Sequence, residues 1–454
     1  MNKYLFILGL VGTVFLSACS ASDDLMTGLS SDEERAIVVE AGRNSEIPIT
    51  MNMGGRSFAT TRGALNSDDE NYLFETPFDA DHKDPAEGKS QYLGVYCLAR
   101  GKQAGAPSIS DIPESDALIK WVNTTYAKWL DNVPARVIKY EYGTDHPSPD
   151  YPSKTYSDIQ FRKEDLSDVK PYYYPFGNWY YYDFYAYYPR VSTVTPKNPR
   201  QFDDLIVADF TITGKEDIIH AKASSNDAIN DAVTNNSVKA YSSKYFRLKK
   251  DASVEEFTIL PQFQFKHKLT QLCFSIQPHA ADAADLSTKG FKLTSMSLKD
   301  VFHKLSLVVA SKKEGYETGD LLVYEPVAAS GRSDIQVWND DDTDPLSSPM
   351  TIATATDDTS LKPVGYAMVP PSDIIAGTNY SHYFVKLTMT QNTGVDVPDT
   401  VVELIPPTSA GFEAGHKYNI VLEIYSPTEI HARAFLSPWE VVNPPTTPAP
   451  IPVD

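Results

Sequence analysis

Cysteine is scarce in this chain, with three residues among 454, at positions 19, 97 and 273. None of them has the close spacing to a second cysteine that a zinc site or a redox centre needs. Cys97 and Cys273 each lie in an apolar stretch, so we expect two buried free thiols in separate domains. A disulfide between them is the alternative in an oxidising compartment.

Motifs of catalysis are also missing. The sequence contains no G-x-S-x-G elbow, no Walker loop and no H-E-x-x-H. Its nine histidines occur singly, and His267 has an inward phase on its strand, which predicts a hydrogen-bonded core residue. The acidic run 339–344 lacks the glycine and closing glutamate of an EF-hand, so we expect a solvated turn. We expect no metal, no cofactor and no enzymatic activity, with a secreted hydrolase using two facing carboxylates as an alternative.

Positive charge is in deficit. Forty Lys and Arg stand against sixty Asp and Glu, a formal net charge of −20 that is spread along the chain. This balance argues against nucleic acid and against anionic membrane surfaces as partners. No stretch beyond residue 15 is apolar enough to predict a membrane span.

The N-terminus carries the most specific pattern. Lys3 is followed by an apolar run over residues 4–15, then by Leu16, Ser17, Ala18 and Cys19. Lipoprotein processing needs a thiol to acylate, so this pattern predicts a lipoprotein signal peptide over residues 1–18 and a lipidated Cys19. The apolar run is shorter than the roughly 20 residues of a membrane span. Residues 19–45 are small, polar and acidic at their start, which predicts a tether between the lipid and the fold.

Alternating apolar residues predict a strand-rich protein. Ile47, Ile49, Met51 and Met53 form the first such row, and the proline at position 48 predicts that this strand lies at an edge or begins a sheet. Residues 257–276 predict a long strand that bends near position 270. Further strands are predicted over 93–99, 291–298, 304–310, 365–369 and 383–389, and a hairpin over 418–424 and 430–436. One helix is predicted over residues 115–130 from apolar spacing of three and four.

Aromatic residues crowd together over residues 172–189. Such rings could stack on sugars, which makes a surface glycan-binding lipoprotein an alternative function and Trp179→Ala its test. We favour a strand whose aromatic rings pack inward. Taken together, these patterns and the chain length predict an all-β protein with a minor helix and two domains, 46–250 and 251–442. A proline-rich tail follows over 443–454.

In order along the chain, these features resemble the fimbrillin family, the lipoprotein-precursor pilins of type V pili in gut and oral Gram-negative bacteria. The resemblance rests on the lipidation motif, the first alternating strand with arginines after it, and the segments 184–189, 204–208, 265–269 and 415–418 leading to Trp439. It implies two β-sandwich domains of transthyretin-like topology. It also implies an outer-membrane lipoprotein precursor that later reaches the cell surface as part of a fimbrium.

The resemblance further implies strand exchange. In such pilins an arginine-specific protease removes the first strand, and the vacated groove takes a strand from another subunit. Here the displaced strand is Ile47, Ile49, Met51 and Met53, and the cut follows Arg62 or Arg56, with Arg62 preferred because small and polar residues flank it. The candidate donor strand is Ile430, Ala432, Ala434 and Leu436, because prolines make the tail a poor donor. Partners implied are other pilin subunits, the protease, and a host or bacterial surface ligand.

Overall fold

The computed structural model describes residues 51–53, 92–102, 121, 127–141, 155–170, 172–173, 180–223, 247–249, 256–258, 261–263, 265–323, 331–339, 348–372, 382–392 and 397–437. These residues form β-sheets, with a single α-helix among them, α5 (Ala283–Lys289). Gly290 ends α5 in a left-handed conformation, and its N–H caps the last turn.

Two sheets make up what we call the first sandwich. The larger has eight strands in the order β13-β1-β4-β3-β2-β5-β10-β14. The smaller has four strands in the order β18-β17-β9-β8, and the Tyr187 ring of the large sheet meets the Phe210 ring of the small one edge-on. The bounds are β1 (Met51–Met53), β2 (Leu93–Lys102), β3 (Lys128–Glu141), β4 (Thr155–Phe161), β5 (Tyr180–Tyr188), β8 (Arg200–Gln201), β9 (Leu205–Thr211), β10 (Ile219–Lys222), β13 (Gln262–Phe263), β14 (Lys266–His267), β17 (Lys304–Ser311) and β18 (Leu321–Val323).

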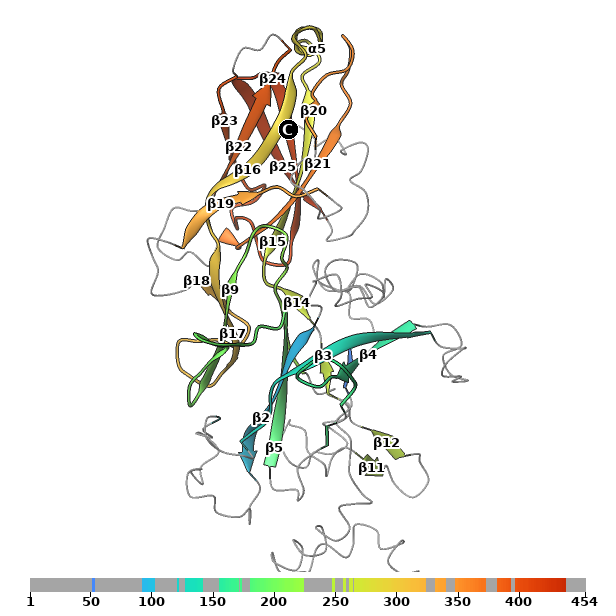
Figure 1. Ribbon diagram of the computed structural model, residues 1–454, viewed down its shortest axis with the longest axis vertical. Coiled ribbons are helices and arrows are strands. Elements are labelled where there is room, and N and C mark those ends of the chain that lie inside the picture. The colour runs from blue at the N-terminus through green and yellow to red at the C-terminus, as the bar shows by residue number, and fades with distance from the viewer. Residues whose placement is uncertain are drawn as a thin grey trace, which may run out of the picture.

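The second sandwich lies at the other end of the molecule (Figure 1). Its sheets have the orders β21-β15-β24-β25 and β19-β16-β22-β23, and β20 pairs with β16 beside the second. Along β22, buried residues alternate with more exposed ones, as expected for a strand with one face on a core. The bounds are β15 (Thr270–Pro278), β16 (Lys292–Phe302), β19 (Arg332–Gln336), β20 (Met350–Thr351), β21 (Lys362–Val369), β22 (Tyr383–Thr390), β23 (Thr400–Leu404), β24 (Lys417–Ser426) and β25 (Glu429–Ser437).

Two small hairpin-like pairs complete the described strands. β6 (Thr193–Val194) pairs with β7 (Lys197–Asn198), and β11 (Arg247–Lys249) pairs with β12 (Glu256–Thr258). The chain also passes repeatedly between the sandwiches: β14 leads to β15 in the second, and β16 returns to β17 in the first. Strands on both sides of the predicted division at residue 250 therefore share the sheets of the first sandwich.

One continuous apolar core runs through both sandwiches. Its largest fully buried side chains include Tyr96, Phe184 and Phe263 in the first sandwich and Phe274 and Phe412 in the second. Burying an aromatic or branched aliphatic side chain stabilises a fold by about 1.5–3 kcal/mol. The predicted all-β class, with a minor helix and a sandwich arrangement, is confirmed.

Three predicted elements have different outcomes. The helix over 115–130 is wrong at its end, because Lys128 to Leu130 begin β3 and Leu130 lies opposite Cys97 of β2; most of its other residues lie outside the described part. The predicted strand over 257–276 is broken into β12 to β15, because its pieces pair with five different strands. The bend near Thr270 is confirmed, since β15 starts there.

Candidate strand-exchange sites

Strand β1 holds the residues of the predicted displaced strand that the structure describes. Asn52 and Met53 lie opposite Gln262 and Phe263 of β13, in parallel pairing. On its other side, Met51 and Asn52 lie opposite Ile159 and Asp158 of β4, in antiparallel pairing. Of the two positions predicted for this strand, the edge is wrong over Met51–Met53: β1 is an interior strand, next to the two-residue edge strand β13.

The neighbours of β1 are apolar on their core side. Ile159 of β4 is 6% exposed and Phe263 of β13 is 1% exposed. A sheet that lost β1 would have unpaired N–H and C=O groups on both β4 and β13, which is a template for pairing with another strand. The position of β1 therefore defines a site that a second strand could fill.

The other predicted residues of this site lie outside the described part of the chain. These are Ile47 and Ile49 of the displaced strand, Arg56 and Arg62 at the cut, and Cys19 at the lipid. Lipidation and cleavage stay predictions.

The candidate donor residues belong to β25. This strand pairs with β24 along its whole length, from Ser426 and Glu429 at the turn to Lys417 and Ser437 at the far end, which confirms the predicted hairpin. Ile430 is buried and Leu436 is 39% exposed, while two alanines between them pack against the core. On the opposite face, Arg433 binds Glu423 at 2.7 Å. Strand β25 is an edge strand, with β24 as its one partner in the described sheet.

The direction of β25 fixes where the chain leaves the second sandwich. Ser437 lies opposite Lys417, and Lys417 lies opposite Gln271 at the start of β15. Residue 437 is therefore at the end of the sandwich that adjoins the first sandwich, and α5 is at the other end (Figure 1). A segment that follows β25 starts near the middle of the molecule.

Residues 182–188 of the aromatic run belong to the core strand β5, while Tyr172 and Tyr173 are half-buried outside it. All residues from Tyr182 to Tyr188 are buried, and the Tyr187 hydroxyl donates to Asn132 Oδ1 at 2.8 Å. Burial raises the pKa of both Tyr96 and Tyr187, and their rings stack. Gly94 is required here, because a Cβ would lie 2.4 Å from both Asn132 Oδ1 and the Tyr187 ring. These buried rings cannot stack on a sugar; Trp179 lies outside the described residues.

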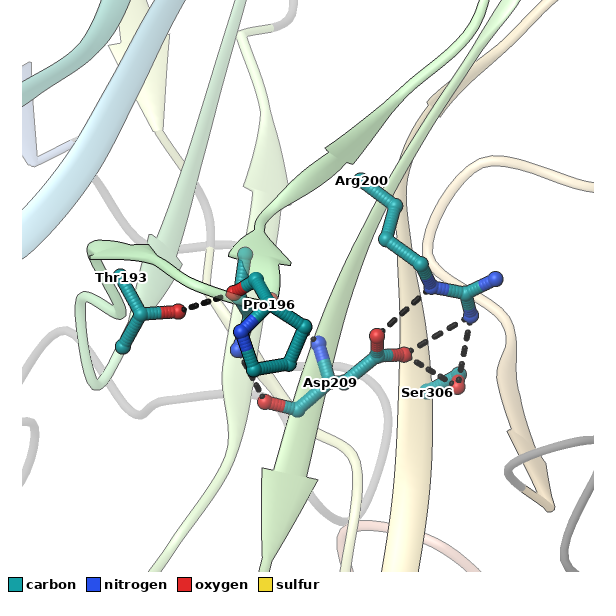
Figure 2. A network of polar contacts seen from close by, with 6 residues as sticks. Thr193, Pro196, Arg200, Asp209 and Ser306 are labelled. Carbon is teal, nitrogen blue, oxygen red and sulfur yellow. Dashed lines mark hydrogen bonds and ion pairs between the residues drawn. The ribbon is translucent and has the colours of Figure 1, made fainter.

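Asp209 is the centre of a hydrogen-bond and ion-pair network that the sequence patterns did not predict (Figure 2). Arg200 of β8 donates to its two carboxylate oxygens at 2.6 and 2.9 Å, and Ser306 of β17 donates to it at 2.6 Å. Asn198 donates to its backbone carbonyl at 2.8 Å. In the sequence, Asp209 is the one charged residue in the otherwise largely apolar strand β9, and this pattern could have indicated a buried ion pair. The network ties β8, β9 and β17 together.

His267 is the core histidine that its phase predicts. Its side chain is 8% exposed, and Nδ1 hydrogen-bonds to Asp217, whose side chain is 4% exposed. Cys97 and Cys273 are free thiols; Cys97 is buried and Cys273 is half-buried. Burial raises the pKa of the Cys97 thiol. They lie in different sandwiches, on β2 and β15.

The described residues form neither a metal site nor a membrane-spanning helix. No group of three or more His, Cys, Asp or Glu side chains there could hold a metal ion, and the acidic residues 340–344 lie outside that part. None of the described helices is long and apolar enough to cross a membrane.

Comparison with known proteins gives similarity only among solved structures. No protein-family model matches the chain, and no curated protein matches it. A candidate cell adhesion protein from Bacteroides uniformis ATCC 8492 is 13% identical, with 87% of this chain and 98% of that chain covered and a TM-score of 0.44. One from Parabacteroides distasonis ATCC 8503 is 9% identical, with 88% and 98% covered and a TM-score of 0.35. One from Bacteroides fragilis NCTC 9343 is 15% identical, with 76% and 98% covered and a TM-score of 0.27.

Proposed function

We propose that this chain is a structural and adhesive pilus subunit, assembled by exchange of its first strand. The observation that carries the proposal is the position of β1, which is an interior strand held by two register pairs to β4 and two to β13. It precedes both Arg56 and Arg62 in the chain. A cut after either arginine would separate β1 from the rest of the fold.

The energetics favour replacement of β1 over a permanently open site. A backbone hydrogen bond contributes a net of about 0.5–1.5 kcal/mol, so a three-residue strand is held weakly once its covalent connection is cut. Its loss leaves unpaired backbone on two strands and uncovers the surroundings of Ile159 and Phe263. A strand from a second subunit restores both the hydrogen bonds and the buried area, which is β-augmentation.

Proteolysis would also end lipid anchoring. Cys19 lies ahead of the predicted cuts, so the acylated cysteine leaves with β1. In this proposal the lipoprotein is the delivery form at the outer membrane, and the assembled form stands at the cell surface. The partners are further pilin subunits, an arginine-specific protease and a surface ligand.

A disulfide that holds β1 in place tests this proposal. Met51 and Ile159 lie directly opposite each other, so Met51→Cys with Ile159→Cys ties β1 to β4. Under oxidising conditions, arginine-specific protease should cut the variant without producing oligomers, and a reductant should then start oligomer formation. Size-exclusion chromatography and denaturing gels without boiling measure both states.

The matched control shares one of the two cysteines. Val137 lies opposite Ile159 on its other side, so Val137→Cys with Ile159→Cys ties β3 to β4 and leaves β1 free. This variant should form oligomers after cleavage with or without reductant. Equal assembly of both variants under oxidising conditions would exclude displacement of β1.

A further inference from the structure

One face of the second sandwich holds a cluster of exposed apolar side chains. Seven large apolar side chains are exposed in the described part of the chain, and three of them lie on the outer face of the sheet β19-β16-β22-β23: Phe384 is 44% exposed, Val401 53% and Ile405, just after β23, 61%. The other four belong to other sheets or to loops; they are Val169, Val194, Phe202 and Leu436. Single exposed apolar residues are common on protein surfaces, whereas a contiguous patch marks an interaction site.

Pairing between β22 and β23 brings the three side chains together. Phe384 lies opposite Glu403, and Val401 and Ile405 are two residues before and after Glu403. Residues two apart in a strand share a face, and diagonal neighbours across a strand pair are within reach of an aromatic ring. The residues on either side of Phe384 in β22 are buried, so its ring faces outward. The three side chains therefore form one patch.

The charges around this patch are nearly balanced. Three pairs of opposite charge lie on the same face: Lys299 with Asp334, Lys386 with Asp399, and His382 with Glu403. The whole chain has a formal net charge of −20, so two copies repel each other at a distance. A face on which basic and acidic side chains balance is a place where this repulsion is small.

The positions of the charges beside Phe384 fit a second copy of the same face. Val385 of β22 lies opposite Leu298 of β16, which places Lys299 beside Phe384 on the side away from Glu403. A two-fold axis along β22 exchanges these two sides, so Lys299 of each copy faces Glu403 of the other and the two Phe384 rings meet. Opposite charges that face each other fix the register of a contact, and like charges oppose it.

The size of the face fits a weak contact. With strands about 4.8 Å apart and a rise of about 3.3 Å per residue, the four strands and the eight residues of β22 give a footprint of about 500 Å² on each copy. Two footprints, about 1,000 Å² together, are at the low end of specific interfaces. We therefore expect a reversible dimer that forms at high local concentration.

We propose that the outer face around Phe384 is a self-association surface, on which a second copy of this chain packs the same face about a two-fold axis. The contact goes beyond strand exchange, because it uses the side chains of a sheet face and needs neither cleavage nor release of β1. It joins two subunits side by side through their second sandwiches.

Charge reversal beside Phe384 tests the two-fold contact. The chain is prepared without residues 1–19, the predicted signal peptide and lipidated cysteine. Sedimentation velocity measures dimers over a concentration series up to about 0.5 mM, which detects any Kd at or below that value. Lys299→Glu places acidic side chains opposite each other at both contacts, and Glu403→Lys does the same with basic ones. Each variant alone should weaken association by about tenfold or more.

A mixture of the two variants is the decisive measurement. In a mixed dimer the reversed charge at position 299 of one copy faces the reversed charge at position 403 of the other, and the second contact keeps its natural pair. The mixture should therefore associate about as strongly as the natural chain, although neither variant does so alone. Damage to the fold by either substitution would not be repaired by mixing.

Two further variants separate this patch from apolar exposure in general. Phe384→Ser should weaken association by about tenfold or more, because it removes the ring at the centre of the contact. Val194→Ser, at the most exposed of the seven side chains, should leave association unchanged. Scanning calorimetry checks that both variants keep the Tm of the natural chain.

Three results would overturn the inference. They are a natural chain that stays monomeric over the whole series, a mixture no more dimeric than its components, and equal loss of dimers in Phe384→Ser and Val194→Ser. Strand exchange fails separately, since a chain that dimerises through this face and never forms oligomers after cleavage contradicts only the proposed function.

Discussion

At the scale of single residues, His220 couples folding to pH. Its side chain is buried, and Nε2–H donates to the Val309 carbonyl at 2.9 Å. Burial, with a smaller effect of Lys268, lowers its pKa from 6.5 to about 3. The folded state keeps this ring neutral, whereas the unfolded chain protonates it near its ordinary pKa. The stability that His220 contributes is therefore present above about pH 6.5 and is lost as the pH falls toward 3.

The variant His220→Gln should reduce this pH dependence, because glutamine keeps an N–H donor and does not titrate. Between pH 6.5 and pH 4.5, the free energy of unfolding of the natural chain should fall more steeply than that of the variant. The difference is at most about 1.4 kcal/mol per pH unit, the value for one proton. Urea unfolding at several pH values measures both slopes, and equal slopes would contradict a neutral buried ring.

At the scale of elements, the hairpin of β24 and β25 is the one most clearly predicted from sequence. Its two rows of alternating residues are separated by a short turn, so each strand has its partner close by in the chain. The same hairpin limits a donor role for β25. A donor β25 must first leave β24, to which it is paired along its whole length.

A disulfide between these strands separates the two possible donors. Glu423 and His431 lie opposite each other, and Glu423→Cys with His431→Cys locks β25 onto β24. If β25 is the donor, oligomers should form only after reduction. The control, Lys386→Cys with Val401→Cys, ties β22 to β23 and should assemble in both states. The first variant removes the contacts Arg433–Glu423 and His431–Glu429, and the control removes Lys386–Asp399, each worth at most about 1 kcal/mol. Assembly of the locked protein under oxidising conditions would move the donor role to residues after 437.

Elements with distant partners were less predictable. The apolar spacing over 115–130 predicts a helix, but its end belongs to β3 because Leu130 pairs with β2. Alternation at Ile47 to Met53 predicts a strand, and β1 is one, but only the fold shows that β4 and β13 flank it. The aromatic run left core and surface roles open, and the described tyrosines of β5 are buried. Alternation of apolar residues predicts which face of a strand is buried, but it does not predict which strands lie beside it.

At the scale of the whole molecule, residues 212–218 join the two sandwiches. This loop follows β9 of the first sandwich, and Trp338 Nε1–H donates to its Thr213 carbonyl at 3.1 Å. The Met368 N–H of β21 donates to the Gly214 carbonyl at 2.6 Å. Gly214 has φ +105°, and a Cβ there would lie 2.4 Å from Ile335 Cγ2. With the chain also crossing between the sandwiches, we expect them to unfold as one unit.

A pair of glycine variants tests this junction. Gly214→Ala should lower the free energy of unfolding by about 2–4 kcal/mol, from a left-handed backbone and overpacking together. Gly315 has φ +81° in a turn with nothing within 4 Å of an added Cβ, so Gly315→Ala should cost only the backbone part, about 1–2 kcal/mol. Scanning calorimetry should show a single transition for the natural chain and the larger decrease in Tm for Gly214→Ala. Equal decreases would mean that the loop does not pack against the second sandwich as described.

The sequence by itself determined the all-β class, the inward faces of the main strands, the last hairpin and the core position of His267. These properties depend on residues close together in the chain, where a period of two is visible. Only the tertiary structure decided that β1 lies inside a sheet, that Tyr182, Tyr185, Tyr187 and Tyr188 of β5 are core residues and that the chain passes repeatedly between the sandwiches. Each of these depends on hydrogen bonds between strands far apart in the sequence, which hydrophobic periodicity does not specify.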